Sequence, residues 1–261
     1  MAADKAIGCI IVRDNNAVWG HCDPHTHTTY SDGLGTPRQV VETAIARGLD
    51  VIAVTDHDSV AGALTARELV HGEGYPLGVI VGSEVTTARG VHLLALFVEE
   101  RLPMFEPVAR TVARIADMGG VALAPHPLSA LTPSMGQRMI EGLLARGLPL
   151  VAVETANPSP AGRPGRRVRE LNQTWGLAEF GGSDAHFLPH IGAAYTLFPG
   201  RSAVDFRRAL DARATVAHMA DEPLARIPLR DYARQSGRSM ILNPAQKILR
   251  ASRKSEVGSR K

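Results

Sequence analysis

The chain has 261 residues, of which 44% are hydrophobic and 21% are charged, so a wholly disordered chain is excluded. The net charge of +3 is uneven, since residues 220–261 carry ten Lys or Arg against four Asp or Glu, which leaves residues 1–219 at about −3. No apolar run approaches the roughly 18 residues of a membrane span, and the N-terminus lacks a secretory pattern. Cys9 and Cys22 alone make no disulfide framework. We therefore expect a cytoplasmic protein with no membrane association.

Short apolar runs rich in β-branched residues alternate along the chain with longer segments of helical periodicity. The expected strands are 17–25, 51–57, 78–84, 90–97, 121–126, 150–156 and 177–186. Helical patterns between them cover 37–49, 105–119 and 135–148. The first of these helices has Thr36 as its expected N-cap, Pro37 at its first position and Gly48 as its stop.

This alternation predicts βαβ units with parallel pairing, because the strands are apolar on both faces and helices separate them. Six or seven such units in about 190 residues favour a closed or nearly closed barrel. A flavodoxin-like open sheet is the alternative, since periodicity does not prove closure.

Six histidines and three carboxylates fall at the ends of the predicted strands or in adjoining loops. They are His25, His27, Asp32, His57, Glu84, His92, His126, Asp184 and His186. The C-terminal ends of parallel strands converge on one rim, so we expect these groups in one cleft. A single histidine at a strand end is more often structural, but nine such groups together are hard to explain in that way.

Nitrogen and oxygen ligands without cysteine favour divalent ions such as Zn²⁺, Mn²⁺ or Fe²⁺. Nine ligands are too many for one ion, whereas two or three ions that share a carboxylate can use them all. Two ions about 3.5–4 Å apart can hold a bridging hydroxide and clamp a phosphoryl group, which is hydrolytic chemistry. The sequence contains no G-x-G-x-x-G after the first strand, no P-loop and no G-x-S-x-G, so we expect no organic cofactor.

The segments that carry these residues resemble the successive motifs of the polymerase and histidinol phosphatase (PHP) superfamily. They read HCDPHTHTTYSDG, TDHDS, GSEV, VHLLAL, APHP and GSDAH, in this order, and the resemblance covers residues 20–215. It implies a distorted (β/α)7 barrel with a di- or trinuclear metal site and phosphoesterase activity.

The resemblance also implies how the nine residues are shared among the ions. The first ion would take His25, His27, Asp184 and a bridging Glu84. The second would take Glu84, His92 and His126, and the third Asp32, His57 and His186. The residues expected to be catalytic are Glu84, Asp184 and His186.

Two departures from related sequences bear on the substrate. Members similar to nucleotidases and to the RNA-end exonuclease carry an inserted helical subdomain between the motifs that here read VHLLAL and APHP. In this chain only 27 residues, 99–125, separate the two motifs. We therefore expect a more open site. Those members also place an arginine after the His-Pro pair, where this chain has Leu128 and Ser129. We expect Arg163 and Arg166, with Arg167 beside them, to bind the substrate's phosphate instead.

The sequence thus predicts a PHP-type barrel over 17–219, preceded by an N-terminal extension over 1–16 and followed by a basic tail over 220–261 with a disordered end. Its expected function is metal-dependent hydrolysis of a phosphate ester (a small phosphomonoester, a nucleotide or a nucleic-acid end) by a metal-bridging hydroxide. One alternative is an amidohydrolase-like C–N hydrolase, which the lack of a strand-end lysine for a bridging carbamate disfavours. The other is a non-catalytic PHP module that binds nucleic acid, with the basic tail as its arm.

Overall fold

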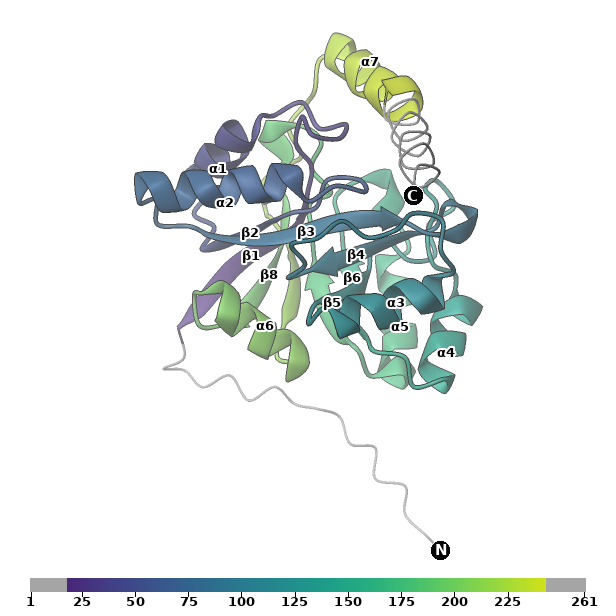
Figure 1. Cartoon of the computed structure of the whole chain (residues 1–261). Helices are drawn as coiled ribbons and strands as arrows, with labels where there is room; N and C mark the ends of the chain where they lie inside the picture. Colours follow the sequence, from purple (N-terminus) through teal and green to yellow (C-terminus); the bar gives the residue numbers. More distant parts are fainter. Residues whose placement is uncertain (1–17, 243–261) are drawn as a thin grey trace, which may run out of the picture.

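The computed structural model describes residues 18–242, which form one strongly curved sheet with helices packed around its outside (Figure 1). Within these residues the strand order is β7-β6-β5-β4-β3-β2-β1-β8-β9. The strands are β1 (Trp19–Thr26), β2 (Val51–Val54), β3 (Gly78–Thr86), β4 (His92–Leu96), β5 (Val121–Ala124), β6 (Leu150–Ala156), β7 (Ala178–Gly181), β8 (Ala194–Pro199) and β9 (Val216–Met219). The helices are α1 (Pro37–Ala46), α2 (Ala61–Glu73), α3 (Val108–Asp117), α4 (Gln137–Ala145), α5 (Gly165–Trp175), α6 (Ala203–Asp211) and α7 (Leu229–Gly237).

The two edges of the sheet meet, so the sheet is a nearly closed barrel rather than the flavodoxin-like alternative. The Thr196 hydroxyl of β8 accepts a hydrogen bond from the Gly181 amide of β7 at 3.0 Å and donates one to the Gly181 carbonyl at 2.9 Å. The Thr215 hydroxyl, just before β9, donates to the Glu179 carbonyl of β7 at 2.7 Å. Side-chain hydroxyls thus connect β7 to β8 and to the start of β9, where the two edges of the sheet are not paired through their backbones.

The prediction of parallel pairing is correct for β1–β2–β3 and β5–β6–β7 but wrong for β4, which runs antiparallel to both neighbours. Residues 87–91 connect β3 to β4, and this segment is too short for a crossover between parallel strands. Strand β8 is likewise antiparallel to β1. The reversal of β4 places its first residue, His92, at the rim where the parallel strands end.

Helix α1 illustrates how local sequence sets the element boundaries. Its N-cap is Thr36, which forms a capping box with Gln39, and Pro37 occupies the first helical position as predicted. The helix ends at Ala46, and Gly48 adopts the left-handed conformation with φ of 71°. It is therefore shorter than the predicted 37–49, because the last residues form the turn into β2.

The barrel interior is apolar at one end and polar at the other. Side chains alternate across a strand, so residues two apart share a face. On β3 the inward side chains pass from buried Ile80 to buried Glu84, and on β6 they pass from Ala152 to Glu154. Phe180, Phe198 and Phe206 fill the apolar end together with Leu94 and Leu96. The polar residues are therefore confined to the rim where the parallel strands end.

Some sequence predictions concern residues that the structure does not describe. The extension over 1–16 and the disordered end of the tail lie outside the described residues. Within the predicted tail, α7 and one π-helical turn over Arg238–Leu242 are helical. Among residues 18–242, no helix is both long and apolar enough to span a membrane.

Candidate metal centre

All nine predicted side chains meet at the polar rim of the barrel. His25 lies on β1, and His27 and Asp32 lie in the loop that follows it. The others are placed by β2 (His57), β3 (Glu84), β4 (His92), β5 (His126) and the loop after β7 (Asp184 and His186). Asp32, Glu84 and the first histidine pair are almost completely buried, whereas the Asp184 side chain is 12% exposed. The topology thus gathers side chains that are up to 161 positions apart in the sequence, the separation of His25 and His186.

Glu84 lies at the centre of this cluster. Its Oε1 atom is 2.9 Å from His92 Nδ1 and 3.1 Å from His126 Nε2. Its Oε2 atom is 3.3 Å from His25 Nε2, 3.2 Å from His27 Nε2 and 3.4 Å from His57 Nδ1. One carboxylate therefore faces two sets of imidazoles, one set on each oxygen. This is the arrangement that a carboxylate bridging two ions requires.

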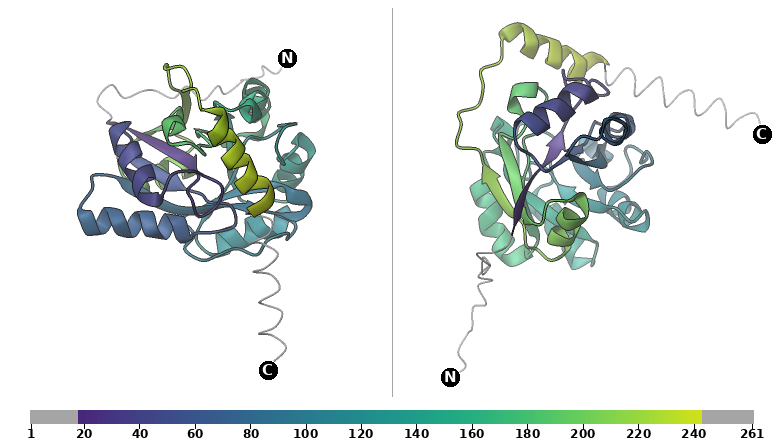
Figure 2. Two further views of the ribbon diagram at one scale, coloured as in Figure 1. Left: turned by 90° about the horizontal axis from the view of Figure 1, so that it is seen from above. Right: turned by 90° about the vertical axis from the view of Figure 1, so that its left-hand side faces the viewer.

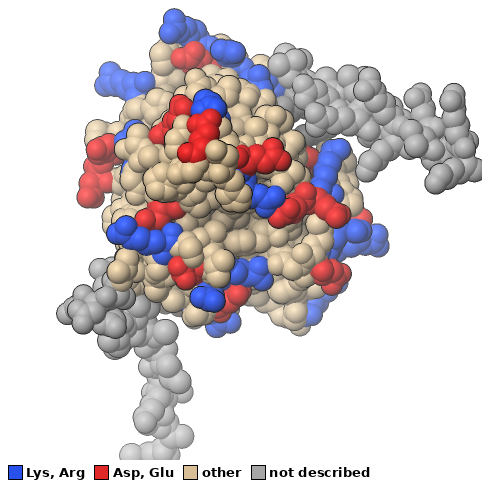
Figure 3. Space-filling view, turned by 60° about the vertical axis from the view of Figure 1, so that its left-hand side comes forward, with Lys and Arg blue, Asp and Glu red and all other residues tan. Residues whose placement is uncertain are grey.

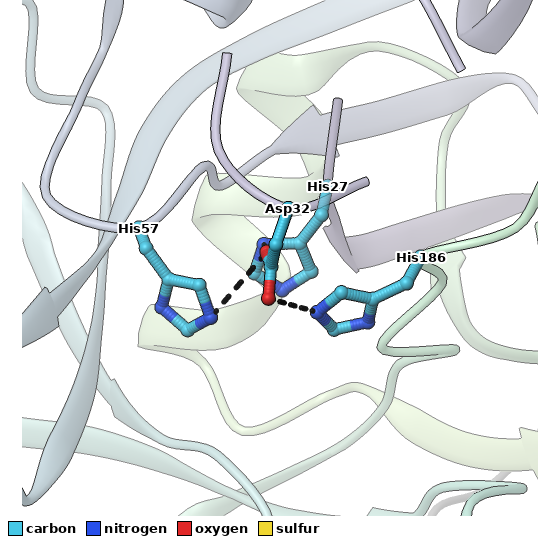
Figure 4. Close-up of side chains that lie close together, drawn as sticks. All are labelled: His27, Asp32, His57 and His186. Atoms are coloured by element: carbon cyan, nitrogen blue, oxygen red, sulfur yellow. Dashed lines mark ion pairs between the residues drawn. The ribbon is translucent and has the colours of Figure 1, made fainter. Parts of the chain in front are cut away.

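The two sides of the cluster are completed by the other carboxylates. Asp184 Oδ1 is 3.4 Å from His25 Nε2 and 3.3 Å from His27 Nε2. Figure 4 shows the Asp32 carboxylate between the rings of His57 and His186. Its oxygens are 3.7 Å from His57 Nε2 and 3.3 Å from His186 Nε2. Each carboxylate thus lies between two imidazoles.

The donor atoms fall into three groups, in each of which all atoms lie within 4.8 Å of one another. One is His25, His27, Glu84 and Asp184, the same set as the first predicted ion site. Another is Asp32, His57 and His186 together with His27, and the third is His57, Glu84 and His92. His126 is absent from that third group, although it contacts Glu84. The structure therefore brings all nine residues together, but His57 rather than His126 shares the third group with Glu84 and His92.

Unsatisfied polar atoms in the cluster fit metal ligation. Within residues 18–242, six buried side-chain nitrogen or oxygen atoms make no hydrogen bond, and four of them belong to the cluster: His27 Nδ1 and Nε2, Asp32 Oδ1 and His57 Nδ1. Buried polar atoms are otherwise almost always hydrogen-bonded, so such a concentration needs an explanation. Nitrogen and oxygen donors in adjoining groups suit a polynuclear site of divalent ions.

The buried charges shift one another's ionisation. Burial raises the pKa of Glu84, but the imidazoles of His92 and His57 outweigh burial and hold it well below its usual range. Burial lowers the pKa of His27, but Asp184 and Glu84 outweigh burial and raise it to about 10. For His57, burial dominates and lowers the pKa to about 4. The carboxylates are thus held ionised, which is the state that binds cations.

Glu154 at the end of β6 belongs to the site, although our sequence analysis did not include it. Its Oε1 atom is 3.2 Å from His25 Nδ1, and its Oε2 atom accepts the His126 amide at 2.6 Å and the Asn157 side-chain amide at 3.0 Å. Glu154 therefore orients two candidate ligands from behind. The signal was present, since Glu154 lies near the end of the predicted strand 150–156 and faces inward as Glu84 does.

Two buried aspartates hold the loops that carry the ligands. Asp56 accepts hydrogen bonds from the Thr28 amide at 2.8 Å, the Thr28 hydroxyl at 2.6 Å and the Ser31 hydroxyl at 2.6 Å, which fixes the loop between His27 and Asp32. Asp23 accepts from the Ser183 amide at 3.0 Å and the Gly192 amide at 2.9 Å. Burial raises the pKa of Asp23 to about 6. These contacts tie the first strand to the loop of Asp184 and His186.

The predicted phosphate-binding arginines lie on the surface at the start of α5. Arg163 precedes the helix, Arg166 is in its first turn, and both side chains are exposed. The neighbouring Arg167 is 3.6 Å from Glu170. The segment 99–125 contains α3 and β5 but no inserted subdomain, as the sequence spacing predicted.

Comparisons with known proteins agree with this architecture. The sequence pattern of the PHP domain family matches residues 23–123, and that of the PHP-associated family matches residues 162–215. The chain is 32% identical over 130 residues to the uncharacterized protein MJ1587 of Methanocaldococcus jannaschii, a match that covers 46% of this chain and 74% of that protein. The chain belongs to the PHP family. By this membership it is a metal-dependent phosphoric ester hydrolase, with a cluster suited to a polynuclear metal site.

Two further relatives define how far the similarity reaches. A phosphoribosyl 1,2-cyclic phosphate 1,2-diphosphodiesterase of Eggerthella lenta is 45% identical to this PHP chain over 86 residues, which are 31% of this chain and 32% of the relative. A crystal structure from Bacteroides vulgatus, described as a two-domain protein containing a predicted PHP-like metal-dependent phosphoesterase, has a TM-score of 0.65 and 24% identity. That match covers 78% of this chain and 66% of the other, and it shows the shared fold.

Proposed function

We propose that this protein hydrolyses a small phosphate ester at a polynuclear metal centre held by the nine clustered residues. The observation that carries the proposal is the position of Glu84, whose two oxygens face five imidazoles at 2.9 to 3.4 Å. In the overall reaction, water adds to phosphorus, the ester P–O bond breaks and the departing alcohol takes up a proton. Divalent ions at such a site would lower the pKa of water and neutralise charge on the phosphoryl oxygens.

The chain's own contribution is to fix the ligands before substrate arrives. Glu84 would serve both halves of the centre, and Asp184 and Asp32 would each complete one side. Glu154 holds the His25 ring from the back, and the Asp184 carbonyl accepts from His186 Nδ1 at 2.9 Å. Each of these contacts leaves the opposite ring nitrogen facing the cluster, which favours metal binding over rotation of the ring.

Two observations favour a small ester over a nucleic acid. A pocket of about 380 Å³ opens beside Asp184 and His186, which is a size suited to a small molecule. No Lys or Arg is among the described residues that line it. On the face shown in Figure 3, acidic and basic side chains of the described residues are interspersed, without the broad basic surface that follows a phosphate backbone.

The C–N hydrolase alternative gains no support from the site. All four lysines of the sequence lie outside residues 18–242, so the described cluster contains no lysine that could form a bridging carbamate. We therefore retain phosphate ester hydrolysis as the function to test.

The test begins with elemental analysis of protein purified without chelator, which should contain two or three divalent ions per chain. The metal-replete protein should then release phosphate or an alcohol from a panel of phosphomonoesters, cyclic phosphodiesters, nucleotides and short RNA. Removal of metal by a chelator should abolish turnover, and re-addition of Mn²⁺, Zn²⁺ or Fe²⁺ should restore it. A protein that binds no metal under any of these conditions would rule the proposal out.

A further inference from the structure

Helix α7 forms one side of the pocket beside the cluster of candidate ligands, and it lies beyond both regions matched by the family patterns. The lining residues on the cluster side are Ser183, Asp184 and His186. Opposite them are Leu224 and, from α7, Tyr232 and Gln235. The matched regions end at residue 215, whereas α7 begins at Leu229. This wall is therefore a feature of this chain that the family comparison does not cover.

Helix α7 is fastened to the loop that carries Asp32. Gln235 Nε2 donates to Asp32 Oδ2 at 3.3 Å, and the Arg238 guanidinium donates to the carbonyls of Thr29 at 2.6 Å and Ser31 at 2.9 Å. The view from above in Figure 2 shows α7 lying across this end of the barrel. Three hydrogen bonds to one loop give the helix a defined position beside the cluster. The wall is thus part of the folded site.

The pocket presents an aromatic and apolar surface next to the candidate ligands. The rings of Tyr232 and Phe187 meet edge to face, with their centroids 5.0 Å apart. Tyr232 remains 43% exposed, and the lining residues Leu131 and Leu224 are 65% and 40% exposed. Exposed large apolar side chains that gather around a pocket indicate a binding surface. Phe187 immediately follows His186, so this surface directly adjoins the cluster.

We propose that this pocket is the leaving-group subsite of the enzyme, that it accepts a planar, mainly apolar ring, and that Tyr232 determines this specificity. The inference rests on the proposed function, because it assumes that the phosphoryl group sits at the cluster. A phosphoryl group held by ligands that include Asp184 and His186 would direct its ester oxygen toward the adjoining pocket. The ring attached to that oxygen would then lie against the face of Tyr232.

The charge of the lining agrees with this assignment. Among residues 18–242, those that line the pocket include no Lys or Arg, so this part of the chain offers no cation there for a second phosphate. Thr132 and Gln235 add side-chain polar groups that can bond heteroatoms at a ring's edge. The substrate class is therefore a phosphate ester of an aromatic or heteroaromatic alcohol with no further anionic group.

The decisive experiment compares two non-hydrolysable anions, phenylphosphonate and methylphosphonate, by calorimetric titration of the metal-replete protein. Both carry the same anionic group, so the ratio of their affinities reports the pocket alone. We expect wild type to prefer phenylphosphonate, and we expect Tyr232→Ala to reduce that preference about tenfold, as loss of an aromatic stacking partner does. Tyr232→Phe should retain the preference because it retains the ring.

Two variants separate loss of the ring from loss of the helix. Leu229→Ala alters an 83% exposed residue on α7 that does not line the pocket, and it should leave the ratio unchanged. Tyr232→Leu keeps apolar bulk against Phe187 but lacks a flat ring, and it should reduce the preference as Tyr232→Ala does. An unchanged ratio in both Tyr232→Ala and Tyr232→Leu, an equal fall in Leu229→Ala, or no preference in wild type would overturn the proposal.

The failure of this inference is distinguishable from failure of the proposed function. Wild-type hydrolysis of phenyl phosphate and of a small alkyl phosphate tests the function. Hydrolysis together with an unchanged affinity ratio in the Tyr232 variants would refute only the subsite. Absence of hydrolysis of any phosphate ester would refute the function itself.

Discussion

The inner and outer sides of the candidate site are built in different ways. The inner side consists of strand ends and short loops, and its candidate ligands such as His25 and Glu84 are at most 1% exposed. The outer side consists of α7, where the pocket residue Tyr232 is 43% exposed and a few hydrogen bonds fasten the helix to one loop. We infer that the inner side fixes the chemistry and that the outer side selects the substrate.

The largest effect is expected at the centre of the inner side. Glu84→Gln removes the charge that five histidines share, so both halves of the centre should lose metal. We expect activity to fall by more than the roughly 10–100-fold that removal of a residue supporting a ligand costs. Asp184→Asn should behave similarly, and elemental analysis together with kcat on a small aryl phosphate measures both.

The matched control for Glu84→Gln is Glu179→Gln. Glu179 is also a strand carboxylate, but it bonds Thr155 and Arg169 away from the cluster. Its replacement should leave metal content and kcat unchanged. If Glu84→Gln kept activity within tenfold of wild type, the central role of Glu84 would be refuted.

A smaller loss of metal affinity and activity is expected at Glu154, which supports two candidate ligands without belonging to the nine. Glu154→Gln keeps the size of the side chain, but its amide cannot accept from His25 and His126 together. We expect metal affinity and kcat to fall by about 10–100-fold, because the His25 ring and the His126 backbone amide lose their common support. Metal titration with a competing chelator measures the change. Wild-type affinity in this variant would show that Glu154 does not position His25.

Steric tolerance should differ between the rim and an outer helix. A Cβ atom at Gly182 would lie 2.7 Å from His25 Cβ and 2.8 Å from Glu154 Oε1, so Gly182→Ala should destabilise the fold by about 1–3 kcal/mol and disturb metal binding. Gly142 in α4 has no atom within 4 Å of such a Cβ, and Gly142→Ala should stabilise the protein by about 0.5–1 kcal/mol. Denaturant unfolding measures both. Equal stability of the two variants would contradict the close packing described around Gly182.

The smallest effect is expected from the end of the chain. Truncation at Ala251 removes a basic segment that follows every candidate ligand and also follows α7. We expect kcat on a small aryl phosphate to be unchanged, whereas KM for an extended polyanion should rise and its salt dependence should flatten. Steady-state kinetics at two salt concentrations checks this. A loss of kcat on the small substrate in a folded variant would assign this segment to the site.

The inner side of the site was more predictable from the sequence than the outer side. Eight of the nine polar residues end or follow apolar runs and His92 begins one, and a curved sheet brings strand ends together whatever its exact shape. Glu154 obeys the same rule and was recoverable from the alternation of Ala152 and Glu154. The antiparallel direction of β4 was not visible in its periodicity, because hydrophobic patterns carry no direction. The length of the connection over 87–91 is the signal that predicts it.

The outer wall was not predictable, because nothing local in the sequence of α7 indicates what it covers. The helix has an exposed Leu229 and two arginines, Arg230 and Arg234, which is typical of a solvated surface helix. Its position depends on contacts such as that between Gln235 and Asp32, which are 203 positions apart. The sequence predicts this region only as part of a basic tail. Whether that tail leaves the chemical step unaffected stays a prediction.

The strand order has a consequence for the time at which the centre forms. Strands β1 to β7 follow one another around the sheet, so the first and last ligand-bearing loops meet only when the barrel comes together. The Ser183 amide bonds Asp23, and the His27 amide bonds the Ala185 carbonyl at 3.0 Å. During synthesis, seven of the nine candidate ligands emerge before Asp184 and His186 exist. Such long-range closure is expected to be slow, and ions bound at the cluster would add their binding free energy to the stability of the closed barrel.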